Sequence, residues 1–258
     1  LNQFRGGTAA VYMEPVGPES GTTPITVEYV KGVERLCRKY GALLVFDEVV
    51  TGFRIGMAGA QGYFGVSPDL TIFGKVIAGG YPGAGGIGGK REYMKYLGAG
   101  LDSSGKKIHK ALVGGTMTAN PLSCCAGYFT LEEIERTNAC QKAGQMGDRI
   151  CAGLKELVKK HGLPFVVWNT GSICHLETVG TMHYQINWKK PWEIPAILGE
   201  TGIRQKEMEH MGAAYMAEGL VTLAGSRLYT SAAYTPKMID QALACFDRVF
   251  ENVAVKAD

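Results

Sequence analysis

The chain has 258 residues, a formal net charge of +3 and 46% hydrophobic residues. This length accommodates one large domain or a domain with a smaller partner, and the apolar content is that of a globular protein with a core. The basic residues are scattered, and no apolar run approaches the roughly 20 residues of a membrane-spanning helix. These features argue against a protein that binds nucleic acid or a membrane.

Cysteine usage points to a reducing compartment. There are seven cysteines, an odd number, with no C-x-x-C pair and no Cys/His spacing typical of a zinc site. We therefore expect free thiols, no metal centre and a cytoplasmic protein. The chain opens at Leu1 without an initiator Met and runs almost directly into a strand-like segment. An internal start is the expectation, so an upstream targeting segment stays possible.

Short apolar runs alternate with helical patterns through about residue 135, which predicts an α/β fold with a mostly parallel sheet and flanking helices. A Gly/Pro/Ser-rich loop is expected over residues 15–24. Thr26 is a candidate cap for the first helix, and Gly41 its end. The predicted strands are residues 9–13, 42–46, 70–73 and 85–89, and helices are expected around 27–40, 91–97 and from Pro121 to about 134.

The second half has a different pattern, in which strands lack glycine-rich ends. A long amphipathic helix is predicted over residues 138–160, followed by strands at 165–168 and 172–177 and by helices at 204–218 and 236–252. This part is expected to be a smaller α+β domain. We place the boundary so that residues 1–137 form one domain and residues 138–258 the other.

Asp47 and Val49 form the first candidate site. Asp47 comes directly after a buried apolar strand, at the strand end where α/β sheets place ligands. Strand geometry sends Asp47 and Val49 to one face and Glu48 to the other. A carboxylate beside a branched apolar residue suits a protonated heteroaromatic ring. On this segment alone, an Asp47 that caps a turn or holds a metal is equally favoured.

Lys75 is the second candidate, within the segment LTIFGKVIAGG. Burial of an unpaired ammonium is costly, so a lysine among apolar residues either reaches solvent or has its pKa lowered, and a neutral amine is what Schiff-base chemistry needs. An isolated Gly-Lys is more often a surface lysine. Its position 28 residues after Asp47, at the next strand end, favours the functional interpretation.

Other motifs give weaker indications. A P-loop fails, because position 69 is Asp and position 76 is Val. Residues 83–88 satisfy G-x-G-x-x-G but follow Tyr81-Pro82 and open no helix, so nicotinamide-dependent oxidoreduction is a remote alternative. The segment GGTMTANP, residues 114–121, offers backbone and hydroxyl donors suited to an anion, although an ordinary capped loop is favoured without further context.

Together these segments resemble the class III aminotransferases of the pyridoxal-phosphate fold type I superfamily, and in particular the glutamate-1-semialdehyde aminomutase branch. MEPVGPESG, CRKYGALLVFDEVVTGFR, SPDLTIFGKVIAGGYPGAGGIGG, GGTMTANPLSCCAG and YTSAAYTPKMIDQAL follow the family order. The likeness spans nearly the whole chain, and the DEVVTGFR…GK pairing is highly specific. It implies a fold type I large domain for residues 1–137, followed by a small C-terminal domain.

The resemblance also implies roles for individual residues. Lys75 would bind the aldehyde of pyridoxal 5'-phosphate and then move protons. Asp47 would pair with the pyridine nitrogen, and Val49 would cover the ring. Thr116, with Gly115, would reach the phosphate of the cofactor bound in the other subunit, which implies a homodimer with shared active sites. The expected function is transfer of an amino group between an amino acid or amine and an oxo compound.

Two departures from the family bear on this expectation. The upstream portion, which supplies the phosphate cradle and the stacked aromatic residue, does not appear in the sequence. Ala-Ala-Tyr234 also stands where relatives often carry Ala-His. Two alternatives therefore remain beside amino transfer between two molecules. One is an intramolecular aminomutase, and the other is a non-catalytic or partial subunit that retains the fold.

Overall fold

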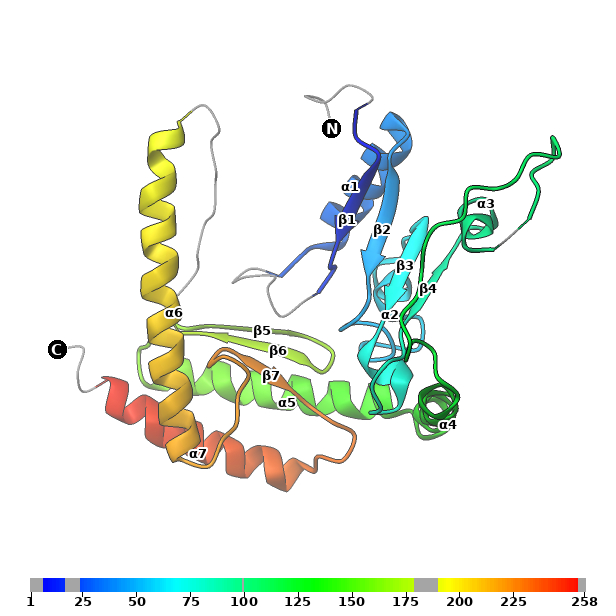
Figure 1. Cartoon of the computed structure of the whole chain (residues 1–258). Coiled ribbons are helices and arrows are strands. Elements are labelled where there is room, and N and C mark those ends of the chain that lie inside the picture. Colours follow the sequence, from blue (N-terminus) through cyan, green and yellow to red (C-terminus); the bar gives the residue numbers. More distant parts are fainter. Residues whose placement is uncertain (1–6, 17–23, 99, 179–189, 255–258) are drawn as a thin grey trace. The chain divides into compact units, whose positions relative to one another are not determined.

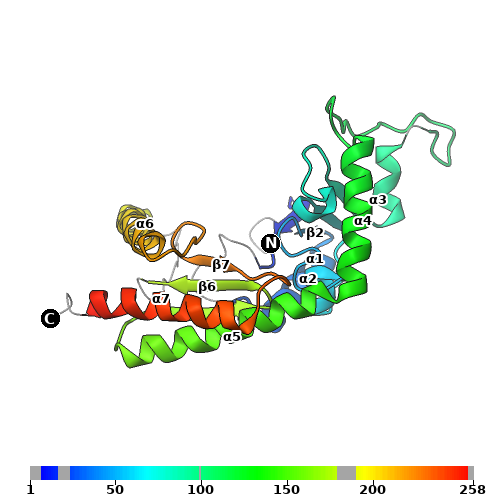
Figure 2. The same cartoon turned by 90° about the horizontal axis from the view of Figure 1, so that it is seen from below.

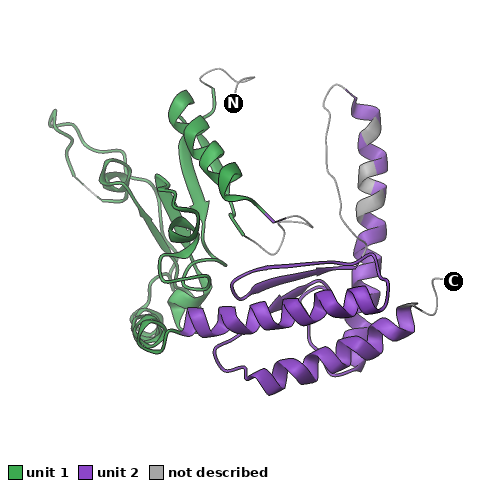
Figure 3. Cartoon of the chain, turned by 180° about the vertical axis from the view of Figure 1, so that it is seen from behind, with its two compact units in different colours: residues 1–17, 25–138 green, residues 18–24, 139–258 purple. Residues whose placement is uncertain are grey.

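The computed structural model describes residues 7–16, 24–98, 100–178 and 190–254. Of the predicted loop over residues 15–24, positions 17–23 lie outside these ranges. The chain forms two compact units, one of residues 1–17 and 25–138 and the other of residues 18–24 and 139–258 (Figure 3). Each unit is described by itself below.

The first unit is built on a four-stranded sheet in the order β1-β2-β3-β4 (Figure 1). Strands β1 (Ala10–Met13), β2 (Leu43–Asp47) and β3 (Leu70–Phe73) are parallel, as the apolar runs predicted. Strand β4 (Gly86–Gly89) is antiparallel to β3, so the sheet is mixed. The connection, residues 74–85, holds a single 3-10 turn and no α-helix of the kind that usually carries the chain between parallel strands.

Helix α1 (Val27–Tyr40) crosses from β1 to β2. The Thr26 side chain accepts a hydrogen bond from the Tyr29 N–H, and Gly41 ends the helix with φ 67°, as the sequence predicted. Val30 and Cys37, two turns apart on α1, are fully buried. The apolar side of α1 thus covers one face of the sheet, where Leu44 and Phe46 of β2 are also fully buried.

Short helical segments and one long helix complete this unit. They are α2 (Gly59–Phe64), the 3-10 turn η2 (Lys75–Ala78), α3 (Arg91–Met94), η3 (Lys95–Leu97) and α4 (Pro121–Thr137). Asn120 caps α4 by accepting from the Ser123 N–H, and Pro121 takes the first helical position. Turn η2 packs closely on α4 at Gly127, which has no side chain. A Cβ at Gly127 would collide with the Ile77 carbonyl.

The second unit is α+β. Its antiparallel sheet has the order β5-β6-β7, formed by β5 (Val166–Thr170), β6 (Ile173–Glu177) and β7 (Arg227–Tyr229). Helices α5 (Ala139–Lys160) and α7 (Pro236–Ala254) lie side by side against this sheet (Figure 2). The 3-10 turn η4 (Pro191–Glu193) and the long helix α6 (Ile194–Ala217) complete the unit.

Alternation along β6 sets the core of the second unit. Cys174 and Leu176 face the helices and pack in one cluster with Leu154 of α5 and with Phe246 and Phe250 of α7. These side chains are fully or almost fully buried, so the apolar faces of the two amphipathic helices pack against the sheet.

Candidate active site

The Asp47 carboxylate stands at the carboxyl end of β2 with both oxygens hydrogen-bonded. Oδ1 accepts the Val49 N–H at 2.9 Å, and Oδ2 accepts the Tyr12 hydroxyl at 2.5 Å. The hydrogen bond to Asp47, followed by burial and the nearby negative charge, raises the pKa of Tyr12 to about 12. Tyr12 lies on β1, and sequence reasoning did not single it out.

Glu48 turns to the opposite face, as strand alternation predicted. Its buried carboxylate accepts hydrogen bonds from the Thr51 hydroxyl and from the N–H groups of Ala60 and Gln61. Those two N–H groups belong to the first turn of α2, so Glu48 caps that helix across 12 residues of chain. This anchor fixes the backbone just after Asp47.

Lys75 follows β3, the parallel neighbour of β2. Glu48 donates its N–H to the Ile72 carbonyl at 2.8 Å, which extends the strand pairing up to the site. Lys75 is exposed and has φ 51°, the left-handed region that favours glycine. Of the two states expected for this lysine, the structure shows the solvent-exposed one. A bulky residue in this conformation is strained, and the motif gave no sign of it.

Val49 links the two strand ends. A Cβ placed on Gly74 would lie 3.2 and 3.3 Å from the two γ-methyl groups of Val49, so the backbone before Lys75 runs directly against this side chain. The structure thus brings Asp47, Val49 and the Gly74-Lys75 turn together at the carboxyl edge of two adjacent parallel strands. This is the edge at which open α/β sheets bind ligands.

Gly115 and Thr116 lie elsewhere in the first unit, on an exposed loop. The loop is attached to residues 82–83: Ala119 donates its N–H to the Gly83 carbonyl at 2.7 Å, and the Asn120 amide donates to the Pro82 carbonyl. Both candidate residues are exposed to solvent.

The remaining glycine-rich motif has a structural role. Residues 86–89 form the edge strand β4, whose register pairs Gly88 with Thr71 and Gly86 with Phe73. The G-x-G-x-x-G pattern of residues 83–88 therefore spans a loop and a strand. It does not open a helix, as a dinucleotide-binding turn requires.

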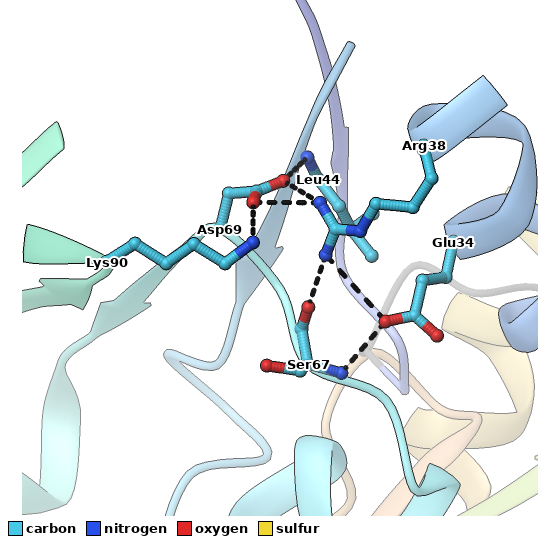
Figure 4. A network of polar contacts seen from close by, with 6 residues as sticks. All are labelled: Glu34, Arg38, Leu44, Ser67, Asp69 and Lys90. Carbon is cyan, nitrogen blue, oxygen red and sulfur yellow. Dashed lines mark hydrogen bonds and ion pairs between the residues drawn. The ribbon is translucent and has the colours of Figure 1, made fainter. Parts of the chain in front are cut away.

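At the opposite end of β3, Asp69 forms a buried anchor (Figure 4). Its carboxylate accepts from the Leu44 N–H at 2.8 Å, from Lys90 at 2.6 Å and from Arg38, whose Nη1 lies 2.8 and 2.6 Å from the two oxygens. Burial acts to raise the pKa of Asp69, but these donors together hold it below its usual value.

Arg38 extends this network by donating from Nη2 to the Ser67 carbonyl at 2.7 Å, while Glu34 accepts the Ser67 N–H (Figure 4). The network ties α1 and the ends of three strands together. It lies at the amino end of β3, whereas Lys75 lies beyond the carboxyl end, so it supports the sheet rather than the candidate site.

Across the described ranges, no three His, Cys, Asp or Glu side chains gather as a metal would require. Within the same ranges, no helix has the length and apolar character needed to cross a membrane.

The sequence profile of the Aminotransferase class-III family matches residues 2–224, so the chain belongs to this family. Among curated relatives, it is 34% identical over 246 residues to glutamate-1-semialdehyde 2,1-aminomutase 2 of Brevibacillus brevis, covering 93% of this chain and 52% of the relative. It is 36% identical over 260 residues to the enzyme of the same name from Shouchella clausii, covering 98% of this chain and 54% of the relative. The chain thus spans about half the length of these relatives.

Solved structures confirm the expected fold. An omega-transaminase from Sphaerobacter thermophilus matches 97% of the chain and 53% of its own, with a TM-score of 0.76 and 24% identity. A β-phenylalanine aminotransferase from Variovorax paradoxus matches 97% of the chain and 54% of its own, with a TM-score of 0.77 and 21% identity. A transaminase with PLP bound gives a TM-score of 0.78 at 22% identity over 99% of this chain and 55% of its own.

Proposed function

We propose that the protein binds pyridoxal 5'-phosphate through Lys75 and Asp47 and transfers an amino group between small amino and oxo compounds. The observation that carries this proposal is the meeting of a hydrogen-bonded carboxylate, an apolar side chain and a solvent-accessible lysine at one edge of two parallel strands. Membership of the class III family supports the same chemistry.

The residues at this edge fit the cofactor in three respects. Asp47 offers an oriented carboxylate to a ring N–H, and Val49 offers methyl groups to a ring face. Gly74, by lacking a Cβ, leaves room for the Val49 side chain directly beside the backbone that leads into Lys75. Lys75 is an exposed residue at the start of η2, and η2 packs against α4, so the lysine is carried on an anchored turn that an aldehyde can approach.

Pyridoxal phosphate, when bound, supplies an aldehyde that links to amines and a ring that withdraws electrons from the carbon bearing the amino group. Asp47 holds the proton on the pyridine nitrogen and thereby keeps the ring electron-poor. Lys75 would hold the aldehyde, and its amine would accept the proton lost by the substrate carbon and return one at the acceptor carbon.

Gly115 and Thr116 are proposed to bind the phosphate of the cofactor in a partner subunit, giving a homodimer with shared active sites. Their exposure on a loop held by residues 82–83 supports this role. In the same proposal, residues 1–137 are the carboxyl-terminal part of the cofactor-binding domain, residues 138–258 are the small domain, and the protein works in the cytoplasm.

Trapping the lysine tests the assignment. The full-length protein is incubated with pyridoxal phosphate, reduced with borohydride and mapped by peptide mass analysis. A pyridoxyl group on Lys75 is expected, and it should disappear in Lys75→Arg but persist in Lys110→Arg, which removes an exposed lysine of the same unit. Labelling that is unchanged in Lys75→Arg would refute the proposal.

An aminomutase is the second candidate, favoured by relatives of that name at 34–36% identity over most of the chain. In an aminomutase the amino group returns to the same carbon skeleton, so turnover needs no external amino acceptor. Single-substrate turnover of glutamate-1-semialdehyde would support this candidate. Turnover that stops unless an oxo acid is added would support transfer between two molecules.

A further inference from the structure

Tyr12 contacts Asp47 at the candidate site, and the proposed function assigns it no role. On β1 it pairs in register with Val45 of β2, so its side chain rises from the same face of the sheet as Asp47, two residues further along β2. Its hydroxyl donates to Asp47 Oδ2 across 35 positions of sequence. The contact thus depends on the parallel pairing of two strands.

The two donors on Asp47 together define how its carboxylate is oriented. Tyr12 donates to Oδ2, and the Val49 N–H donates to Oδ1 at 2.9 Å. With one donor on each oxygen, rotation of the carboxylate breaks at least one hydrogen bond. A carboxylate offers about four lone-pair sites, so each oxygen keeps one for a further donor.

The exposure of Tyr12 argues against a role in packing the core. The residue is 58% exposed, whereas side chains of the sheet that serve the core, such as Phe46, are fully buried. Because the hydrogen bond to Asp47 and then burial raise the pKa of Tyr12 to about 12, the hydroxyl keeps its proton, and stays a donor, throughout the range in which enzymes work.

We infer that Tyr12 is a positioning residue: its hydroxyl and the Val49 N–H hold the Asp47 carboxylate in the orientation that receives the ring N–H of the cofactor. The inference rests on the proposed function for the identity of the ring. It adds a residue that acts on the cofactor through Asp47, without contact with the reacting atoms.

The first measurement needs no cofactor and so stands apart from the proposed function. Tyrosine ring carbons of the full-length protein are titrated by NMR, with Tyr12 assigned from Tyr12→Phe. Tyr12 is expected to titrate about two pH units above an ordinary tyrosine. In Asp47→Asn, which removes the charge but keeps the shape, the midpoint should fall back toward 10.

The second measurement uses the cofactor-loaded protein. Tyr12→Phe removes only the hydroxyl, and Tyr29→Phe makes the same change on an exposed tyrosine of α1. Loss of a hydrogen bond to a charged group predicts a pyridoxal phosphate Kd about five- to tenfold higher in Tyr12→Phe. It also predicts a less protonated ring nitrogen, read from the NMR shift of that nitrogen in isotope-labelled cofactor. Tyr29→Phe should change neither.

A double-mutant cycle tells whether the effect passes through the carboxylate. In an Asp47→Asn background, Tyr12→Phe should change the Kd by less than about twofold, because the two residues share one interaction. A full effect in that background would mean that Tyr12 acts on its own and would overturn the inference. So would an ordinary Tyr12 titration, or an unchanged ring nitrogen in Tyr12→Phe. Absence of a pyridoxyl group on Lys75 in the wild type would instead refute the proposed function, and the role of Tyr12 with it.

Discussion

Val49 packs its two γ-methyl groups against the backbone of Gly74, the residue immediately before Lys75. A Cβ at Gly74 would approach these methyl groups to 3.2 and 3.3 Å, closer than ordinary van der Waals contact. The backbone of Gly74 is extended, at φ −158°, so any residue can adopt its conformation. Space, rather than backbone freedom, therefore explains glycine here.

Gly74→Ala should lower the free energy of unfolding by about 1–2 kcal/mol, because the added methyl overpacks the contact with Val49. The measurement is urea denaturation of the full-length protein. Adding Val49→Ala to Gly74→Ala should recover part of the loss, since the two side chains share the space. Gly114→Ala is the control, because a Cβ there meets open space. A loss of similar size at Gly114 would rule out a specific contact at Gly74.

Asp69→Asn is expected to cost about 2–3 kcal/mol of stability. The substitution keeps the shape but removes the charge that holds Arg38, Lys90 and the Leu44 N–H. Asp240→Asn is the matched control, because the Asp240–Arg149 ion pair is exposed on both sides and should contribute less than about 1 kcal/mol. Thermal unfolding of both variants at neutral pH checks the difference.

The same carboxylate predicts a pH dependence. The pKa of Asp69 is lowered in the folded state, so the unfolded chain takes up its proton at a higher pH than the folded one. The stability from Asp69 is therefore fully present above the usual aspartate pKa of about 4 and is lost as pH falls through the lower folded value. Wild type should lose stability over this acid range more steeply than Asp69→Asn. Parallel curves for the two proteins would contradict the prediction.

Much of the sheet could be predicted from sequence, because buried parallel strands appear as continuous apolar runs. The runs ending at Phe46 and Phe73 gave β2 and β3, and with them the placement of Asp47 and Lys75 at strand ends. The antiparallel direction of β4 could not be predicted, since a glycine-rich edge strand has little apolar pattern to indicate how it pairs. Among the second-unit strands, β7 was missed because three residues are too few for a period to show.

Features that depend on tertiary register were missed for a physical reason. Nothing in the strand AVYM marks Tyr12 as a partner of Asp47, because the contact exists only once β1 and β2 pair in their observed register. Glu48 likewise reads as a polar neighbour of Asp47, and its cap on α2 depends on a loop that folds back over 12 residues. The left-handed backbone of Lys75 is also set by its surroundings, since propensity would place glycine there.

Glu48→Gln should destabilise the protein by about 2–3 kcal/mol. The Glu48 carboxylate accepts from Thr51, Ala60 and Gln61 with its two oxygens. An amide has only one acceptor oxygen, so its NH2 group would face at least one of these donors, and that donor would lose its hydrogen bond. Thr51→Val, which removes one donor and keeps the volume, should cost less. Unfolding monitored by circular dichroism compares the two, and an equal loss would place the penalty on the Thr51 hydroxyl alone.

Lys75→Gly should stabilise the fold while abolishing cofactor attachment. Glycine adopts φ 51° without strain, whereas lysine there has an unfavourable backbone conformation, so the substitution should raise the free energy of unfolding by about 0.5–1 kcal/mol. Lys75→Ala removes the amine but keeps a Cβ, and should leave stability near that of the wild type. Both variants are compared with the wild type in the absence of pyridoxal phosphate, by thermal and urea unfolding, so that ligand stabilisation does not enter. If Lys75→Gly is more stable than both Lys75→Ala and the wild type, the chain retains a strained residue at this position for its amine. Equal stability of the three proteins would mean that the left-handed turn costs nothing, and that the lysine is held there without strain.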